Sequence, residues 1–257
     1  MHQYYLEDVT KLFGRGQAAV RGINLVVDRG ERVALIGPSG AGKTTLFRLL
    51  NCTLRPTTGM LRINGDETGN LHGKKLLRVR SNIGTIYQQH NLVPRLKVVH
   101  NVLSGRLGRW STFRSLASLV KPSDIDMAHE ALNQVGIPDR IFDRTDELSG
   151  GQQQRVAIAR VLVQNPEVIL ADEPVSSVDP SLANAIVQLL IEISRNARKS
   201  LIASLHSIDL ALAYFPRIVG IKQGKVLFDL SPDNISDDLL AELYGAQSSD
   251  PKATEPS

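Results

Sequence analysis

Residues 37–44 read GPSGAGKT and directly follow the apolar run RVALI at residues 32–36. The stretch fits the pattern G-x-x-x-x-G-K-[ST] between a strand and a helix, and that position gives the pattern its meaning. Its glycines let the backbone curl so that successive N–H groups face phosphate oxygens. Lys43 adds a positive charge near the β- and γ-phosphates, and Thr44 offers a hydroxyl group to Mg²⁺. The residues that we expect to bind a nucleoside triphosphate here are Gly37, Pro38, Ser39, Gly40, Ala41, Gly42, Lys43, Thr44 and Thr45.

Two acidic residues end another apolar run, VILADE at residues 168–173. Carboxylates are costly at the end of a buried strand unless a cation or a proton transfer uses them. We therefore expect Asp172 to hold Mg²⁺ through water, and Glu173 to orient or deprotonate the water that attacks the γ-phosphate. The alternative is an acidic strand end that faces solvent, and the phosphate loop in the same chain argues against it.

Polar residues follow two further apolar runs. His206 ends SLIASLH (200–206), and Gln88 follows IGTIY (83–87). Because ligands bind at the carboxyl ends of strands in α/β sheets, both residues are placed to contact a bound ligand. Gln89 leaves the assignment of the glutamine open by one position. The other histidines lack the spacing of a metal site.

A second turn rich in small residues lies in LSGGQQQR at residues 148–155. Its residues Ser149, Gly150, Gly151 and Gln152 begin a helix and can present a hydroxyl and backbone N–H groups to an anion. The alternative is a plain helix start with Ser149 as the N-cap. The first loop and the two acids already surround one nucleotide. A second phosphate-binding turn therefore predicts a second nucleotide, or a nucleotide held by another copy of the chain.

The pattern of apolar residues indicates an α/β fold. Alternation in QYYLEDVT (3–10) and AAVRGINLVV (18–27) predicts an antiparallel, half-buried sheet. Residues 90–160 have helical spacing, with Ser123 or Asp124 as a plausible N-cap. We therefore predict a P-loop NTPase (RecA-like) core with an N-terminal antiparallel β subdomain and an inserted helical subdomain. Strands are further predicted at 32–36, 60–65, 83–87, 167–173, 200–206 and 217–229.

Length, composition and charge limit the class of protein to which the chain can belong. The chain of 257 residues is 42% hydrophobic and carries a net charge of +4, which is typical of an ordinary globular protein. No apolar run approaches the ~20 residues that a membrane span needs, and the N-terminus does not resemble a signal peptide. The single Cys52 excludes an internal disulfide and is expected to be a small core or half-buried residue, not a nucleophile. The basic residues are interpreted as scattered over a solvated surface, so we expect no nucleic-acid partner.

GPSGAGKTT, Gln88, LSGGQ, VILADEP, SSVD (176–179) and His206 occur in the order seen in ATP-binding cassette (ABC) ATPases. The chain resembles that family over residues 3–244, so domain 1–244 is expected to be its nucleotide-binding domain, with the helical subdomain at about 90–160. The tail 245–257 is expected to be disordered. The resemblance implies a head-to-tail homodimer in which the LSGGQ turn of one subunit closes over ATP held by the other.

The resemblance also implies a role for individual residues. Ser149 and Gly151 would contact the γ-phosphate held by the partner, and Asp179 would line the dimer seam. His206 would clasp the γ-phosphate, and Gln88 would connect Mg²⁺ to the helical subdomain. Phe13, which the apolar pattern alone places in the core, would instead stack on adenine. Val178 departs from the family, in which leucine is usual at this position.

Longer stretches, among them GRLGRWSTFRSL (105–116) and ELYG (242–245), resemble ATPase subunits of phosphonate importers and their phosphite relatives. This resemblance implies integral-membrane permease partners, an indirect periplasmic solute-binding protein, and a place on the cytoplasmic side of the bacterial inner membrane. Segment 105–116 would lie near the groove for a permease helix. An ATPase subunit does not contact the solute, so the sequence leaves phosphonate, phosphite and phosphate open.

Two other classes of ABC protein are alternatives to an importer subunit. A non-transport ABC accessory protein of phosphonate breakdown shares the nucleotide motifs, and only the importer-like segment 105–116 disfavours it. ABC ATPases of DNA repair or chromosome organisation carry coiled-coil or zinc-bearing insertions. This chain has neither heptads nor cysteine pairs, so that class is disfavoured.

Overall fold

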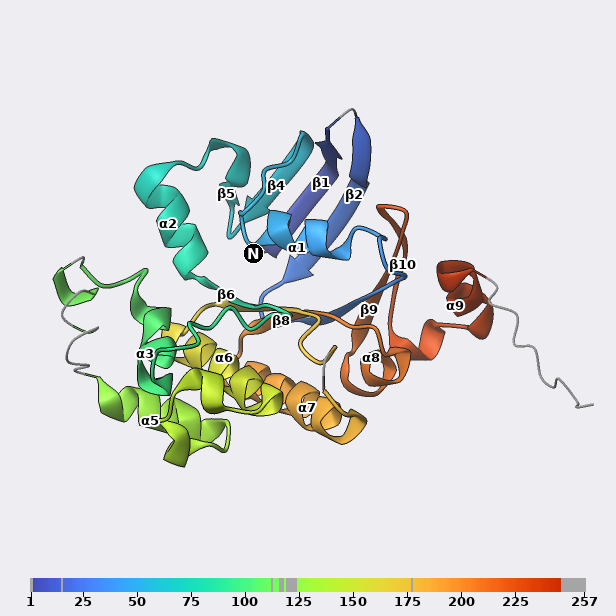
Figure 1. Ribbon diagram of the computed structural model, residues 1–257. Coiled ribbons are helices and arrows are strands. Elements are labelled where there is room, and N and C mark those ends of the chain that lie inside the picture. The colour runs from blue at the N-terminus through green and yellow to red at the C-terminus, as the bar shows by residue number, and fades with distance from the viewer. Residues whose placement is uncertain are drawn as a thin grey trace, which may run out of the picture.

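The computed structural model describes residues 2–14, 16–111, 113–115, 118, 124–176 and 178–245. They form two β-sheets and surrounding helices (Figure 1). The predicted disordered tail lies outside the described residues apart from Gly245. Within the described part of the chain, no helix combines the length and the apolar character needed to cross a membrane.

The smaller sheet is antiparallel, with strand order β2-β1-β4-β5. The expected alternation is present in its first strand, where Tyr4, Leu6 and Val9 are buried and Glu7 and Asp8 are exposed. The buried side chains share a core with Leu46 and Phe47 of the helix that follows the phosphate loop. The predicted antiparallel β subdomain is therefore confirmed. The strands are β1 (His2–Phe13), β2 (Gln17–Asp28), β4 (Thr58–Ile63) and β5 (Asp66–Glu67).

The larger sheet has the order β10-β9-β3-β8-β7-β6, and β9, β3, β8, β7 and β6 run parallel. The predicted run 217–229 is a hairpin of two strands that turns at Gln223 and Gly224. Because the parallel strands end at one edge, the residues after them gather there. The strands are β3 (Arg32–Ile36), β6 (Ile83–Ile86), β7 (Val168–Asp172), β8 (Ser200–Ser204), β9 (Arg217–Lys222) and β10 (Lys225–Leu230).

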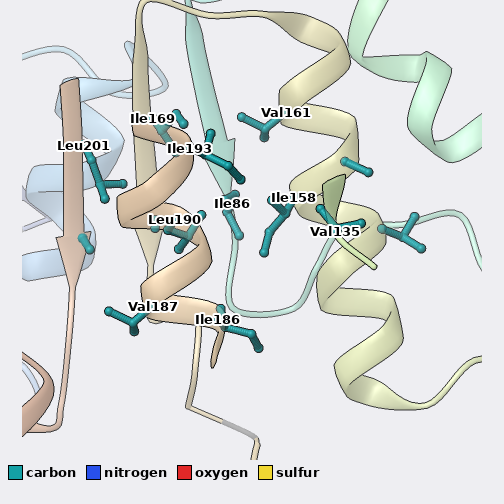
Figure 2. Close-up of a cluster of buried hydrophobic side chains, with 14 of the residues drawn as sticks. Ile86, Val135, Ile158, Val161, Ile169, Ile186, Val187, Leu190, Ile193 and Leu201 are labelled. Atoms are coloured by element: carbon teal, nitrogen blue, oxygen red, sulfur yellow. The ribbon is translucent and has the colours of Figure 1, made fainter. Parts of the chain in front are cut away.

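Helices cover the larger sheet on both faces. Figure 2 shows Ile158 and Leu190, on two neighbouring helices, packed against the strand residue Ile86. Alternate residues of β3 divide between two cores: Ala34 faces this cluster, and Val33 faces the cluster that the smaller sheet covers. Both faces are thus buried, as short apolar strands without alternation predict. The α-helices are α1 (Lys43–Leu50), α2 (Gly73–Ser81), α3 (Val98–Leu103), α5 (Ile125–Gln134), α6 (Gly150–Gln164), α7 (Pro180–Asn196), α8 (Ile208–Tyr214) and α9 (Asp237–Tyr244).

Helices α3, α5 and α6 pack on one another and form the expected helical region. Asp124 stands at the N-cap position of α5, but its side chain makes no capping hydrogen bond. It instead accepts a hydrogen bond of 2.9 Å from Arg114. Ser123 lies outside the described residues. Cys52 is buried as expected, and burial raises the pKa of its thiol to about 11, so it does not supply a thiolate.

Candidate nucleotide site

The phosphate loop joins β3 to α1 and owes its shape to glycines. A Cβ atom on Gly37 would lie 2.1 Å from the Ile221 carbonyl oxygen, and one on Gly42 would lie 2.3 Å from that of Ala19. Both glycines have positive φ angles, of 149° and 106°. A Cβ at Gly40 would meet nothing within 4 Å. The loop is therefore anchored at its ends and open at its tip, as a backbone cradle for phosphate requires.

The Lys43 side chain packs against the phosphate loop and binds its backbone. Its side chain is buried, and Nζ donates to the Gly37 carbonyl at 2.6 Å and to the Pro38 carbonyl at 3.1 Å. Burial lowers the pKa of Lys43, and the carboxylates of Glu173 and Asp172 oppose that shift. The ammonium group is thus held beneath the predicted phosphates with negative charge nearby.

Asp172 ends β7 with a carboxylate suited to a cation. Among the described residues, its buried Oδ1 atom has no hydrogen-bond partner. Burial, and then repulsion from Glu173, raises the pKa of Asp172. A desolvated oxygen without a partner is costly unless a ligand uses it. The described residues contain no group of three or more His, Cys, Asp or Glu side chains able to hold a metal. One carboxylate with neutral oxygens suits Mg²⁺, which keeps several waters.

Thr44, Gln88, Gln89 and Asp172 line one cleft of about 330 Å³. The structure therefore brings together the three residues predicted to hold Mg²⁺, although they come from α1, the turn after β6, and β7. Gln88 and Gln89 both line the cleft and both are exposed. The one-position ambiguity between them remains.

Sequence reasoning missed the residue that holds the glutamine turn. Arg160 of α6 donates to the His90 carbonyl at 2.9 Å and to the Asn91 carbonyl at 2.6 Å. His90 and Asn91 both have positive φ angles, 57° and 48°, which L-residues with side chains rarely adopt. The guanidinium group therefore stabilises a strained turn. The available signal was one charged residue within the apolar run VAIARVLV (156–163).

Glu173 and His206 are in contact at the ends of β7 and β8. The His206 Nε2 atom lies 2.6 Å from Oε1 of Glu173, whose side chain is only 15% exposed. Glu173 has a φ of 51°, a strained backbone for a residue with a long side chain. The structure thus brings together the predicted base and the predicted γ-phosphate contact.

The LSGGQ turn begins α6. Ser149 is the N-cap, and it forms a capping box with Gln152: the Gln152 N–H donates to Ser149 Oγ, and the Ser149 N–H donates to Gln152 Oε1. Ser149 and Gly150 are exposed. A Cβ on Gly151 would lie 2.4 Å from Cδ2 of Leu182 in α7. The side chain of Gln152 is therefore engaged within its own chain, and its contact with a nucleotide stays a prediction.

The predicted seam residue Asp179 is exposed at the N-cap of α7. It accepts hydrogen bonds from Ser181 Oγ at 2.6 Å and from the Leu182 N–H at 3.0 Å. The bond from Ser181 lowers the pKa of Asp179 the most. Asp179 is therefore held ionised, at the start of the same helix that contacts Gly151.

Phe13 is 40% exposed at the end of β1, so the core position predicted from its pattern is wrong. The Nζ atom of Lys11 lies 5.5 Å from the centre of its ring. An exposed aromatic ring beside a cation fits an anionic nucleotide with a stacking base. Its contact with adenine stays a prediction.

Comparisons with known proteins agree with this geometry. Residues 20–176 match the family model described as ABC transporter. A phosphonates import ATP-binding protein of Cupriavidus necator is 47% identical over 248 residues, covering 96% of this chain and 89% of the relative. A protein of the same name from Pseudomonas fluorescens is 46% identical over 229 residues, covering 89% of this chain and 86% of the relative.

Solved structures show the same fold. An ATP-binding cassette determined as a dimer in a post-hydrolysis state with ADP and Pi superposes with a TM-score of 0.76 at 32% identity. The match covers 89% of this chain and 98% of that one. The cbiO1 protein of Clostridium perfringens, part of an ABC transporter complex, has a TM-score of 0.78 at 28% identity, covering 94% of this chain and 91% of that one.

Proposed function

Because the chain belongs to the ABC transporter family, we propose that it is the ATP-hydrolysing subunit of an importer for phosphonate or a related phosphorus oxyanion. The observation that carries the proposal is the gathering of Lys43, Asp172, Glu173 and His206 at one edge of the larger sheet. The relatives, which match nearly the whole chain, are phosphonates import ATP-binding proteins, and this supports the type of solute.

ATP would bind with its phosphates over the tip of the loop at Ser39 and Gly40, where the backbone is exposed. Lys43 contributes positive charge from beneath, and Phe13 offers an exposed face to adenine. Thr44, Asp172 and Gln88 would hold Mg²⁺ in the cleft that they line. The bound ion would neutralise charge on the β- and γ-phosphates.

Glu173 accepts a proton from the attacking water. Its carboxylate is held by His206, so one oxygen is fixed and the other is free to face the water. The His206 side chain is 45% exposed, so it is also accessible to the γ-phosphate. After hydrolysis these contacts are lost, and the free energy that favoured the closed state is lost with them.

The complete site is proposed to need two copies of the chain. Ser149 and Gly150 are exposed at the N-terminus of α6, where N–H groups favour an anion, and Asp179 is exposed at the start of α7. The similarity to a cassette that was solved as a dimer supports a homodimer. Closure over ATP, transmitted through the turn at Gln88, would move permease subunits in the membrane.

The working complex would thus comprise the homodimer and integral-membrane permease subunits on the cytoplasmic side of the bacterial inner membrane. A periplasmic solute-binding protein would act indirectly by delivering the oxyanion to the permease. The proposal includes no nucleic-acid partner.

The test is ATP hydrolysis by the complex reconstituted in vesicles with its permease and solute-binding protein. We expect hydrolysis to rise when the binding protein is loaded with a phosphonate, and phosphite and phosphate loading would rank the solutes. Capture of soluble lyase subunits in place of a permease, without solute-dependent hydrolysis, would instead support the accessory protein of phosphonate breakdown.

A further inference from the structure

The charge of this chain is unevenly placed. The chain has 26 acidic residues, yet none lies between Glu67 and Asp124. That interval contains α2, the turn at Gln88, α3 and the segment that follows α3. The basic residues in this part of the chain therefore have no acidic neighbours in sequence, a feature that the interpretation of scattered basic residues did not include.

Helix α2 and the segment after α3 lie side by side, and Arg109 of the segment donates to Asn82 at the end of α2. A cleft is lined both by α2 residues, including Leu77, and by residues of the segment, including Gly105 and Gly108. A Cβ on Gly108 would lie 3.4 Å from Cβ of Ser81. Figure 1 shows α2 and the segment after α3 at the same side of the molecule. The basic face is defined here as Lys74, Lys75, Arg78 and Arg109, all of which are exposed.

The four cations have no acidic partner in the described part of the chain. None of them forms a salt bridge with another described residue, whereas Arg144 and Arg217 elsewhere pair with carboxylates. Arg109 donates to the Asn165 carbonyl and to the Asn82 side chain. Positive charge without a partner is costly to gather on one surface unless an anionic partner uses it.

Large apolar side chains are exposed on the same two segments, α2 and the segment after α3. Leu77 is 59% exposed, Leu107 is 48% exposed and Phe113 is 85% exposed. Phe113 is the most exposed large apolar side chain in the described part of the chain. Cations interleaved with exposed leucine and phenylalanine are typical of proteins that lie against a membrane interface.

We propose that the basic face binds the surface of an anionic bilayer directly. The cytoplasmic leaflet carries negative lipids that attract basic segments. The cytoplasmic loops of membrane proteins carry an excess of Lys and Arg, so a permease is a poorer electrostatic match. That the side of the molecule with the Gln88 turn and the basic face points toward the membrane rests on the proposed function, in which the Gln88 turn acts on the permease. Lipid binding by the isolated chain does not depend on that function.

The experiment is co-sedimentation of the purified chain with vesicles, without permease and without ATP. We expect binding to vesicles of phosphatidylglycerol mixed with phosphatidylcholine, and little binding to phosphatidylcholine alone. Salt at 0.5 M should release the protein, because it shortens the screening length. K74Q/R78Q should weaken binding on the order of 20-fold, since each cation near an anionic surface contributes roughly fivefold. F113S should weaken binding further without changing its salt dependence.

The matched control is R195Q/R198Q, which removes two exposed cations at the far end of α7. It should bind vesicles as the unaltered chain does, and all variants should retain ATP binding and their melting temperature.

Equal losses in the two double variants, equal binding to neutral vesicles, or no binding by the unaltered chain would overturn the proposal. So would equally tight binding to an RNA oligonucleotide, or a K74Q/R78Q variant that keeps vesicle binding and loses only the permease. Failure of hydrolysis with intact vesicle binding would affect the proposed function alone.

Discussion

The Nε2 atom of His206 lies 2.6 Å from the Oε1 atom of Glu173. The two residues are far apart in sequence and meet because β7 and β8 are adjacent parallel strands that end together. The contact fixes one carboxylate oxygen and leaves the other for water. It also predicts which substitutions separate ATP binding from hydrolysis.

Glu173→Gln should bind ATP but hydrolyse it on the order of 10²–10³-fold more slowly, because an amide cannot accept the proton from water. The bound nucleotide should then persist, and ATP should convert the chain into a dimer detectable by size-exclusion chromatography. Glu167→Gln is the matched control, since Glu167 is an exposed acid just before β7. Near-normal turnover by Glu173→Gln would exclude Glu173 as the base.

Ser149→Arg, introduced into the Glu173→Gln chain, should prevent that ATP-dependent dimer while leaving ATP binding intact. Ser149 is exposed at the start of α6, so a large cation there obstructs the partner, while loss of the cap to Gln152 costs only about 1 kcal/mol. Ser236→Arg is the matched control, because Ser236 is an exposed serine that caps another helix, α9, in the same way. A dimer that forms as before in the Ser149→Arg chain would contradict the role of this turn across the dimer.

Asp172→Asn should stabilise the nucleotide-free chain and weaken its response to Mg²⁺. Burial raises the pKa of Asp172, so ionisation at neutral pH costs the folded state more than the unfolded state. The free energy of unfolding therefore falls, through this group, as pH rises above the ordinary pKa of an aspartate. We expect a melting temperature roughly 2–4 °C higher at pH 7. The gain in melting temperature should vanish near pH 3, where Asp172 is protonated in both the folded and the unfolded state. A gain that persists at that pH would refute the electrostatic cause.

The positions of the site residues were largely predictable because apolar runs mark buried strands, and parallel strands end at a shared edge. This reasoning placed Asp172, Glu173 and His206 together. It did not predict the exposure of Phe13. Alternation along β1 shows which face of the strand is buried, but not that the covering core ends before the last residue of the strand. It also left out Arg160, whose partners are backbone carbonyls of another segment. Backbone acceptors leave no trace in the residue types of a sequence.

Arg160→Ala should lower the free energy of unfolding by about 1.5–3 kcal/mol, since two carbonyls of a strained turn lose a charged donor. It should also raise the Mg²⁺ concentration needed for hydrolysis, because the turn carries Gln88. Arg155→Ala is the control on the same helix: Arg155 donates to the Val135 carbonyl, away from that turn. An unchanged Mg²⁺ requirement in Arg160→Ala would limit Arg160 to a structural role.

Gly151→Ala and Leu182→Ala should together be less harmful than the sum of their separate effects. The added methyl group would lie 2.4 Å from Cδ2 of Leu182, so Gly151→Ala alone forces the Leu182 side chain to move, at a cost of about 1–3 kcal/mol. Leu182→Ala alone leaves a gap, and the double variant fills it. A coupling of about 0.5–3 kcal/mol in a thermal or denaturant cycle would establish the contact. Gly150→Ala is the control, because a methyl group there meets nothing within 4 Å. Additive effects would show that Leu182 moves aside freely, and that Gly151 is not required by packing within the chain.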